Sequence, residues 1–153
     1  MATARQFDQP RMDLYEQDFL AWIELQVEAL RSRQASRLDW DNVLEEMECM
    51  GRSEKNALRS RLQGLLMHLM KWQWQPDKRS KSWASSIRNQ RLGLKYLINY
   101  SPSLKRLIPE VLINVWGDAA DEAAFETGLP ITTFPEVCPW DVDTQVLINW
   151  WPE

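Results

Sequence analysis

Apolar residues recur at intervals of three and four along most of this chain, which is the spacing of one face of an α-helix. The first such pattern predicts a helix that begins at Asp13 and runs to about Gln34. Asp13 is the expected N-cap, and Glu16 stands three positions later, as in a capping box. The apolar face of this helix would consist of Tyr15, Phe19, Trp22, Ile23 and Leu30.

A second pattern follows, with Asp39 or Asp41 as its cap and an apolar stripe of Val43, Leu44, Met47 and Met50. Gly51 and Ser53 interrupt this stripe, so the sequence predicts a break or bend there. From Glu54 the pattern becomes stronger and as wide as a buried helix face, and it ends at Pro76. The stripe consists of Leu58, Leu62, Leu65, Leu66, Leu69 and Trp72.

Two further helices are predicted after a short basic loop. Ser80 or Ser82 would cap the first, which must end before Pro102 because the residue ahead of a proline avoids the helical region. Its buried positions would be Trp83, Ile87, Leu94, Leu97 and Ile98. The next helix would be capped by Ser101, with Pro109 as a kink or restart and Gly128 as its stop signal. Its apolar positions are Leu104, Leu107, Ile108, Val111, Leu112, Val115, Trp116 and Ala119.

The remaining chain predicts a proline-rich connector at 129–139 and a short helix from Val142 to Trp150, capped by Asp141. No segment alternates apolar and polar residues in the way a strand requires. The predicted fold class is therefore all-α, an irregular bundle of four to five helices with a proline-rich connector and a short C-terminal helix. We expect residues 1–12 to form a frayed tail and residues 13–153 a single domain.

Composition narrows the class of protein only slightly. The 153 residues are 44% apolar and carry a net charge of −4, which suits solubility and indicates no particular partner. Cys49 and Cys138 lie far apart and outside any CxxC pattern, so we expect two buried thiols and neither a disulfide framework nor a zinc site. The first twelve residues do not fit a signal peptide, and the longest apolar run, 62–70, is too short to span a bilayer. These features favour a cytoplasmic protein with no membrane contact.

Many dispersed stretches together resemble a known family. They include Tyr15 to Phe19 with Trp22, Leu38-Asp39, Glu45-Glu46, Met50 to Ser53, His68 to Trp72, Gln75-Pro76, Ser82-Trp83, Arg88, Arg91, Ser101 to Leu104, Glu126 to Leu129, and Phe134-Pro135 to Cys138-Pro139. The chain resembles, over roughly 14–152, the domain-of-unknown-function family numbered 29, small helical proteins abundant in cyanobacteria. The resemblance implies a small helical bundle and brings with it no activity, cofactor or catalytic residue.

Charge is strongly segregated along the sequence. From Arg52 to Lys95 eleven Lys or Arg residues face only Glu54 and Asp77, a net of +9. Residues 110–153 contain nine acidic residues and no basic one, whereas residues 1–51 have a net charge of −6. One explanation is that the basic helices pack beside the acidic segments, within one chain or between copies in a homo-oligomer. Another is that the basic stretch 71–91 binds a partner.

Single-stranded nucleic acid is one such partner, since cations interleaved with aromatic rings attract phosphates and stack on bases. An acidic protein is another. Trp74 is the expected stacking residue, because Trp72 and Trp83 fall on apolar stripes. The candidate binding residues are Lys71, Trp74, Lys78, Arg79, Lys81, Arg88 and Arg91.

Candidate chemical groups are few. His68 is the only histidine, and we expect it to be structural, with Glu45 or Glu46 as its candidate hydrogen-bond partner. These carboxylates with Glu48 and His68 do not reproduce the Glu-x-x-His pattern of helical di-metal sites, because position 65 is Leu. No phosphate loop, HExxH or Gly-x-Ser-x-Gly motif occurs. The sequence therefore favours a non-enzymatic protein with no metal and no cofactor.

Tryptophans at the C-terminal end offer a further surface. Trp140, Trp150 and Trp151 either fold back over the end of the bundle or form an aromatic contact for a partner or a second copy. The sequence thus predicts a macromolecular interaction module that binds a protein partner or itself. The alternative is a nucleic-acid-binding or nucleic-acid-processing protein, whose only chemical groups would be Glu45, Glu46 and His68.

Overall fold

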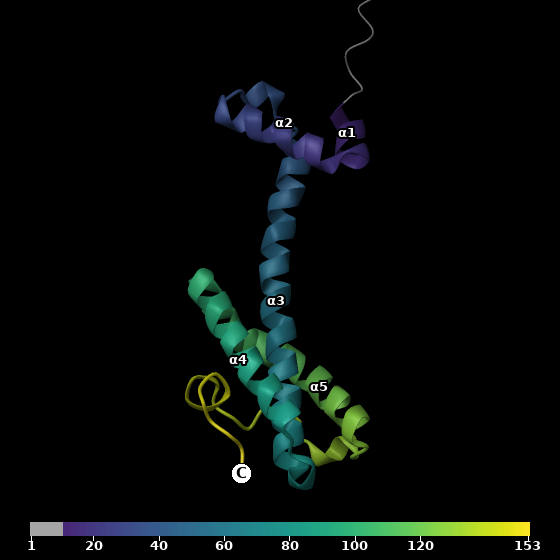
Figure 1. The fold of residues 1–153 in the computed structure, drawn as a ribbon, viewed down its shortest axis with the longest axis vertical. Helices are drawn as coiled ribbons and strands as arrows, with labels where there is room; N and C mark the ends of the chain where they lie inside the picture. Colours follow the sequence, from purple (N-terminus) through teal and green to yellow (C-terminus); the bar gives the residue numbers. More distant parts are fainter. Residues whose placement is uncertain (1–10) are drawn as a thin grey trace, which may run out of the picture. The chain divides into compact units, whose positions relative to one another are not determined.

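The computed structural model describes residues 11–153 as helices and turns with no strand in that range (Figure 1). The elements in order are α1 (Arg11–Gln17), α2 (Phe19–Arg31), η1 (Ala35–Arg37), α3 (Trp40–Trp74), η2 (Pro76–Lys78), α4 (Lys81–Tyr100), η3 (Pro102–Leu107), α5 (Ile108–Thr127), η4 (Ile131–Thr133) and η5 (Val142–Val146). The predicted all-α class is confirmed. Most of the predicted tail, residues 1–10, lies outside the described residues. Within the described range no helix is both long and apolar enough to cross a membrane.

Contacts group the chain into two compact units, one ending at Arg52 and the other running from Ser53 to Glu153. The first unit contains α1, α2, η1 and the beginning of α3. The second contains the rest of α3 and all later elements. The expectation of a single domain from residue 13 onward stays a prediction.

The first unit has two short helices where the sequence predicted one. The chain leaves the helical region at Asp18 (φ −144°, ψ 86°), whose carboxylate accepts a hydrogen bond from the Ala21 N–H at 3.0 Å. Asp18 therefore caps α2, and the prediction of one helix capped by Asp13 was wrong. The pattern of apolar residues did not reveal the break, because it keeps its spacing on both sides of Asp18.

A small buried cluster holds α2 against the chain that follows it. The Trp22 side chain is only 4% exposed, and its indole donates to the Asp39 carboxylate at 3.0 Å. The Asp39 N–H in turn donates to the Gln26 side chain at 2.7 Å. Ala29 and Leu38 complete the buried apolar residues of this unit among the side chains that the structure describes.

Helix α3 is continuous through Gly51 and Ser53, so the predicted break there was wrong. A glycine inside a helix costs only about 1 kcal/mol relative to alanine. Arg52 offsets part of this cost, since its guanidinium bonds to Glu45 at 2.7 Å and lies 3.9 Å from Glu48 on the preceding turns. The apolar residues further along α3 are buried and hold the helix in place.

The core of the second unit forms where α3 packs against α4 and α5 (Figure 1). The predicted stripe of α3 lies at its centre from Leu58 to Leu69, and Trp72 is only partly buried against it. Seven of the predicted positions on the later elements are buried: Ile87, Leu94, Leu104, Ile108, Val115, Trp116 and Ala119. The others are partly buried, and Trp83 lies outside the core cluster. The largest fully buried side chains of the core are Leu58, Leu62, Leu65, Leu66, Leu69, Met70, Ile87, Leu94, Val115 and Val146. Most of the predicted core of this unit is therefore confirmed, whereas Trp83, Leu97 and Ile98 are only partly buried.

Most predicted helix ends in this unit are confirmed. Helix α3 ends two residues before Pro76, and the Ser80 hydroxyl caps α4 by accepting from the Trp83 N–H at 3.1 Å. Helix α4 ends before Pro102. Gly128 terminates α5 in the left-handed region at φ 73°, which a residue without Cβ adopts freely. Ser101 caps nothing with its side chain and instead donates to Glu54 at 2.9 Å.

The C-terminal segment differs from its prediction. Instead of an α-helix from Val142 to Trp150, the chain forms one π-helical turn, Val142–Val146. Asp141 caps this turn as predicted, by accepting from the Thr144 N–H at 2.8 Å. Beyond the turn the chain is irregular and returns to the core through its aromatic side chains. This return path forms one wall of the groove described below.

Candidate functional site

A basic groove lies between α4 and the C-terminal segment, with a volume of about 950 Å³. One wall is a single face of α4 carrying four cations: Lys81, Arg88, Arg91 and Lys95. Residues three, four and seven apart share a helix face, and the spacing of these cations satisfies that rule. Ser80 fixes the beginning of this face, because it caps α4 directly before Lys81. The other lining residues are Ala84, Ser85, Asn89, Leu92, Leu147, Ile148, Asn149 and Trp151.

Among the side chains that the structure describes, no acidic one lines this groove. Lys81, Arg88 and Lys95 are exposed and form no ion pair within the described chain. A smaller hollow of about 240 Å³ continues past Arg91 and Lys95 and includes Lys105 and one acid, Asp143. The groove therefore carries a concentrated positive charge in a protein whose net charge is negative.

Arg91 is the central cation and the most enclosed one, with 9% of its surface exposed. Its Nε donates to the Val146 carbonyl at 2.9 Å, and its Nη2 to the Gln145 carbonyl at 3.3 Å. Nη1 is buried and has no hydrogen-bond partner. Its guanidinium carbon lies 5.7 Å from the centre of the Trp151 ring. Burial lowers the pKa of Arg91 to about 10, because the charged form loses its hydration.

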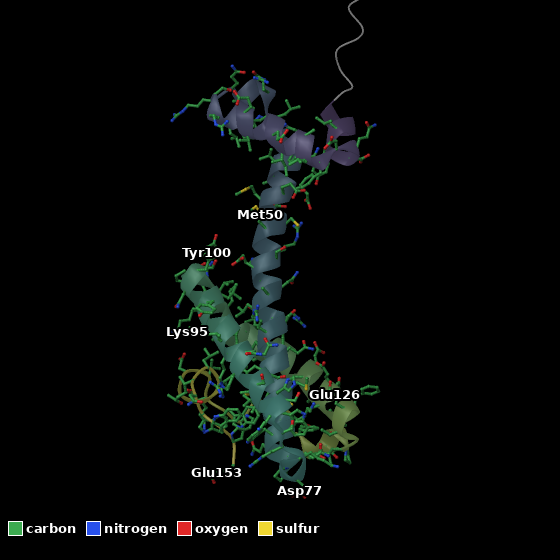
Figure 2. All side chains as sticks on the ribbon, viewed as in Figure 1. Met50, Asp77, Lys95, Tyr100, Glu126 and Glu153 are labelled. Atoms are coloured by element: carbon green, nitrogen blue, oxygen red, sulfur yellow. The ribbon has the colours of Figure 1, made fainter. Side chains whose placement is uncertain are left out.

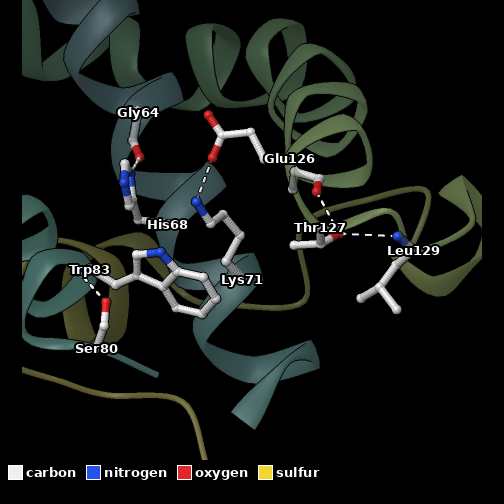
Figure 3. A network of polar contacts seen from close by, with 9 residues as sticks. Gly64, His68, Lys71, Ser80, Trp83, Glu126, Thr127 and Leu129 are labelled. Atoms are coloured by element: carbon white, nitrogen blue, oxygen red, sulfur yellow. Dashed lines mark hydrogen bonds and ion pairs between the residues drawn. The ribbon is translucent and has the colours of Figure 1, made fainter. Parts of the chain in front are cut away.

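Lys71, a candidate for the binding surface, lies inside the second unit. It is 6% exposed and forms an ion pair with Glu126 of α5, and its ammonium lies 4.7 Å from the centre of the Trp83 ring (Figure 3). A second pair between the same helices joins Arg59 to Asp118 at 3.1 Å. The basic and acidic segments are thus matched in part within the chain.

Trp74, the candidate for base stacking, is half-buried among other aromatic rings. Its ring lies 5.5 Å from Phe134 and 5.8 Å from Trp140, measured between ring centres. Trp140 is 8% exposed and donates its indole N–H to Gln73 at 3.1 Å. Its ring also lies 5.7 Å from Trp150. These rings fold back onto the end of the bundle, which was one of the two predicted arrangements.

Of the remaining candidates in the basic stretch, some line the groove and others do not. Arg79 folds back over the end of α3, where its Nε donates to the Trp72 carbonyl at 2.8 Å and its guanidinium lies 5.1 Å from the Trp72 ring. Lys78 is exposed in η2 and does not line the groove. Trp151 lies against Trp72 at 4.7 Å and also lines the groove. Of the predicted binding residues, the structure brings together Lys81, Arg88 and Arg91. It adds Trp151, which the sequence analysis assigned to a partner or self contact.

The candidate chemical groups are not assembled into a centre. His68 is half-buried and its Nδ1 lies 2.8 Å from the Gly64 carbonyl on its own helix (Figure 3), so Gly64 is its partner in place of Glu45 or Glu46. Glu45 pairs with Arg52, and Glu46 accepts a hydrogen bond from the Tyr15 hydroxyl. Among residues 11–153 no three His, Cys, Asp or Glu side chains are grouped as metal ligands.

The first unit has an apolar surface that the sequence analysis did not single out. Nine large apolar side chains between Phe19 and Met50 are each at least 42% exposed; Met50 is labelled in Figure 2. They are Phe19, Leu20, Leu25, Val27, Leu30, Trp40, Leu44, Met47 and Met50. The sequence assigned Phe19, Leu30, Leu44, Met47 and Met50 to the apolar faces of helices. Helical spacing marks a residue as part of an apolar face, but it does not show whether this chain or another covers that face.

Sequence reasoning also missed several groove residues. Lys95 could have been found, because it continues the spacing of Lys81, Arg88 and Arg91 along one helix face; it is labelled in Figure 2. Leu147 and Ile148 carried no signal of this kind. They lie more than fifty residues further along the chain, and only the folded C-terminal segment brings them to α4.

The fold and these surfaces define a small helical protein with a basic groove and an exposed apolar face. Residues 14–151 match the family described as the domain of unknown function DUF29, and the chain belongs to this family. No curated protein and no solved structure matches the chain.

Proposed function

We propose that this protein is an interaction module that associates with a second copy of itself through the apolar face of its first unit. The observation that carries the proposal is the set of nine exposed apolar side chains between Phe19 and Met50. Single exposed apolar residues are common, but several that share one helix face form a patch of the kind that marks an interface. In the described part of this unit only Trp22, Ala29 and Leu38 are buried apolar residues.

Helix α2 has a second apolar stripe besides the one that holds Trp22. Leu20, Ile23, Val27 and Leu30 follow one another at intervals of three and four, and three of them are 42–66% exposed. This is the spacing of a helix face that packs into a neighbouring helix. Burying one large apolar side chain contributes about 1.5–3 kcal/mol. A partner helix on this stripe would therefore stabilise the unit considerably.

The beginning of α3 presents a similar stripe. Trp40, Leu44 and Met47 are spaced four and three apart and are each about 60% exposed. Met50, 63% exposed, extends the apolar surface by almost one turn. Methionine side chains adapt their shape to the surface they contact, which suits an interface.

A second copy is the occupant that these observations favour. A unit with so few buried apolar residues requires constant cover, and another copy of the chain is present wherever the chain is. In a two-fold dimer each stripe can pack against the same stripe of the second copy. A substitution in the stripe would therefore change both sides of the interface. The net charge of −6 on residues 1–51 opposes this pairing, but salt screens exposed charges beyond about 8 Å at physiological ionic strength.

The proposal can be tested by light scattering coupled to size exclusion over a range of protein concentrations. We expect a dimer for the wild-type chain and a monomer for the double variant Leu20→Glu/Val27→Glu. Ile113→Glu is the matched control, because Ile113 is 76% exposed but lies on α5 in the second unit. It should leave the dimer intact. A wild-type chain that is monomeric up to submillimolar concentration would overturn self-association and leave the face to a different protein.

Nucleic-acid binding is the less favoured function. Of the residues expected to carry it, Lys71 is paired inside the bundle and Trp74 packs against Phe134 and Trp140. The cations that stay exposed along α4 line a groove of limited size, whose ligand is considered next.

A further inference from the structure

We propose that the groove along α4 binds a small phosphorylated molecule that has an apolar or planar body, with its phosphate held between Arg88 and Lys95 above the guanidinium of Arg91. This site is separate from the apolar face of the first unit, and the proposal does not depend on self-association. Three features of the second unit support it: the charge of the groove, the state of Arg91 and the chemistry of the opposite wall.

The charge of the groove is uniform and unmatched. Four cations line one face of α4 and no carboxylate lines the same groove. Two other cations of this unit are paired, Arg59 with Asp118 and Lys71 with Glu126. Like charges held close together repel one another, so an anion bound among them would lower the electrostatic energy of the fold.

The burial of Arg91 without a counter-charge is the second, independent observation. The residue is nine-tenths buried, and its guanidinium donates only to two neutral carbonyls and leaves Nη1 without a hydrogen-bond partner among the described residues. A buried charge without a counter-charge is costly, and buried charges in proteins are normally paired. Arg91 lines both the groove and the smaller hollow beside it. An anion in the groove would supply the missing counter-charge.

A phosphate group suits this arrangement better than a single carboxylate. It carries more than one negative charge near neutral pH and offers three strong acceptor oxygens. Arginine and lysine together are the residues that bind such a group, arginine through its planar fork and lysine as a point charge. Arg88, Arg91 and Lys95 follow one another at intervals of three and four, so one phosphate can reach the region that all three share.

The opposite wall indicates what the rest of the ligand is. Leu147, Ile148 and Trp151 are apolar, and Asn89 and Asn149 provide amide groups that can orient a polar ligand atom. A volume of about 950 Å³ is within the range typical of sites for small organic molecules. A bare inorganic anion would make no contact with this apolar wall. The site therefore fits a nucleotide-like or similar small phosphate ester.

Isothermal titration calorimetry with ATP, pyrophosphate and adenosine tests the proposal, with labelled ten-nucleotide poly(dT) followed by anisotropy as the second arm. We expect ATP and pyrophosphate to bind with a stoichiometry of one and adenosine to give no signal. ATP should bind more tightly than pyrophosphate, and Ile148→Asp should reduce this difference. Arg88→Gln and Lys95→Gln, both at exposed positions, should each weaken phosphate binding about tenfold.

Lys78→Gln is the matched control, because it removes one exposed positive charge of the same basic stretch outside the groove. It should change the affinity by less than about twofold. An equal loss of affinity in Lys78→Gln and Arg88→Gln would overturn the proposal. Binding would then depend on the overall positive charge of the basic stretch and not on the groove. The absence of heat with both phosphate ligands at low salt would also overturn it. Tight binding of the oligonucleotide without binding of pyrophosphate would assign the groove to a nucleic-acid strand instead.

Discussion

The ammonium group of Lys71 on α3 pairs with the carboxylate of Glu126 on α5, beside the ring of Trp83 (Figure 3). The two partners are unequal, because the side chain of Lys71 is 8% exposed and that of Glu126 is 40% exposed. Removal of the carboxylate would leave a charge buried without a partner. Removal of both charges would leave an apolar contact.

We therefore expect Glu126→Ala to lower the free energy of unfolding by about 1–3 kcal/mol, the cost of an unpaired buried charge reduced for the partial exposure of Glu126. Adding Lys71→Met to this variant should restore most of the loss, because methionine fills similar space without a charge. Urea denaturation of the single and double variants measures both effects. Asp118→Ala is the control: Arg59 and Asp118 are both about half exposed, so their pair should contribute at most about 1 kcal/mol. Equal losses for Glu126→Ala and Asp118→Ala would contradict the prediction.

Substitution of glycine by alanine should have opposite effects on stability inside a helix and at a helix end. Gly51 lies inside α3 with no atom within 4 Å of an added Cβ, so Gly51→Ala should raise the free energy of unfolding by about 0.5–1 kcal/mol. Gly128 has φ 73° at the end of α5, where a Cβ is strained, so Gly128→Ala should lower it by about 1 kcal/mol. Thermal unfolding followed by circular dichroism compares the two variants. A loss of stability in Gly51→Ala would show that α3 is not a regular helix at this point.

The two cysteines should differ in their rates of alkylation. Cys49 is exposed, whereas Cys138 is half-buried, and burial raises its pKa by disfavouring the thiolate. At pH 8 we expect iodoacetamide to modify Cys49 first, and modification of Cys138 to require a higher pH. Mass spectrometry of Cys49→Ser and Cys138→Ser, each retaining one thiol, measures the two rates separately. The finding also corrects the expectation of two buried thiols, since Cys49 lies at the surface.

The hydroxyl of Tyr15 should lose its proton at an unusually high pH. This hydroxyl donates to the Glu46 carboxylate, which raises its pKa to about 12, and the negative charge nearby adds to the effect. Because the folded value is above the usual value of about 10, the stabilising contribution of this bond is fully present below pH 10. It is lost as the pH rises towards 12.

The absorbance of tyrosinate in the near ultraviolet measures this ionisation, with Tyr15→Phe providing the spectrum to subtract. In Glu46→Gln the pKa of Tyr15 should fall towards 10. An unchanged value in that variant would show that Glu46 is not the cause.

Several elements of the fold could be predicted because their signals are local. Ser80, Pro102 and Gly128 mark helix ends through properties of one residue: a hydroxyl acceptor, a missing N–H and a missing Cβ. The break at Asp18 gave no such signal, since aspartate is common both at caps and along exposed helix faces. Gly51 gave a false signal, because its cost is smaller than the stabilisation from the packing of α3.

The candidate site could be predicted only on the α4 side. Arg88 and Arg91 share a helix face, which periodicity shows, and their charge has no acidic neighbour in the sequence. Leu147 and Trp151 reach the same groove through a π-helical turn and an irregular return path, which have no periodic pattern. Trp74 was placed on a polar side by its position in the helix, but the connector brings Phe134 and Trp140 to that side.

Arg91 holds the C-terminal segment through the main-chain carbonyls of Gln145 and Val146. Every residue type supplies a carbonyl, so this contact places no demand on the identity of the side chains at positions 145 and 146. In related sequences the arginine can therefore be constrained while its partners vary, and the pair would show no covariation. Methods that infer contacts from correlated substitutions would then miss the contact that closes the groove.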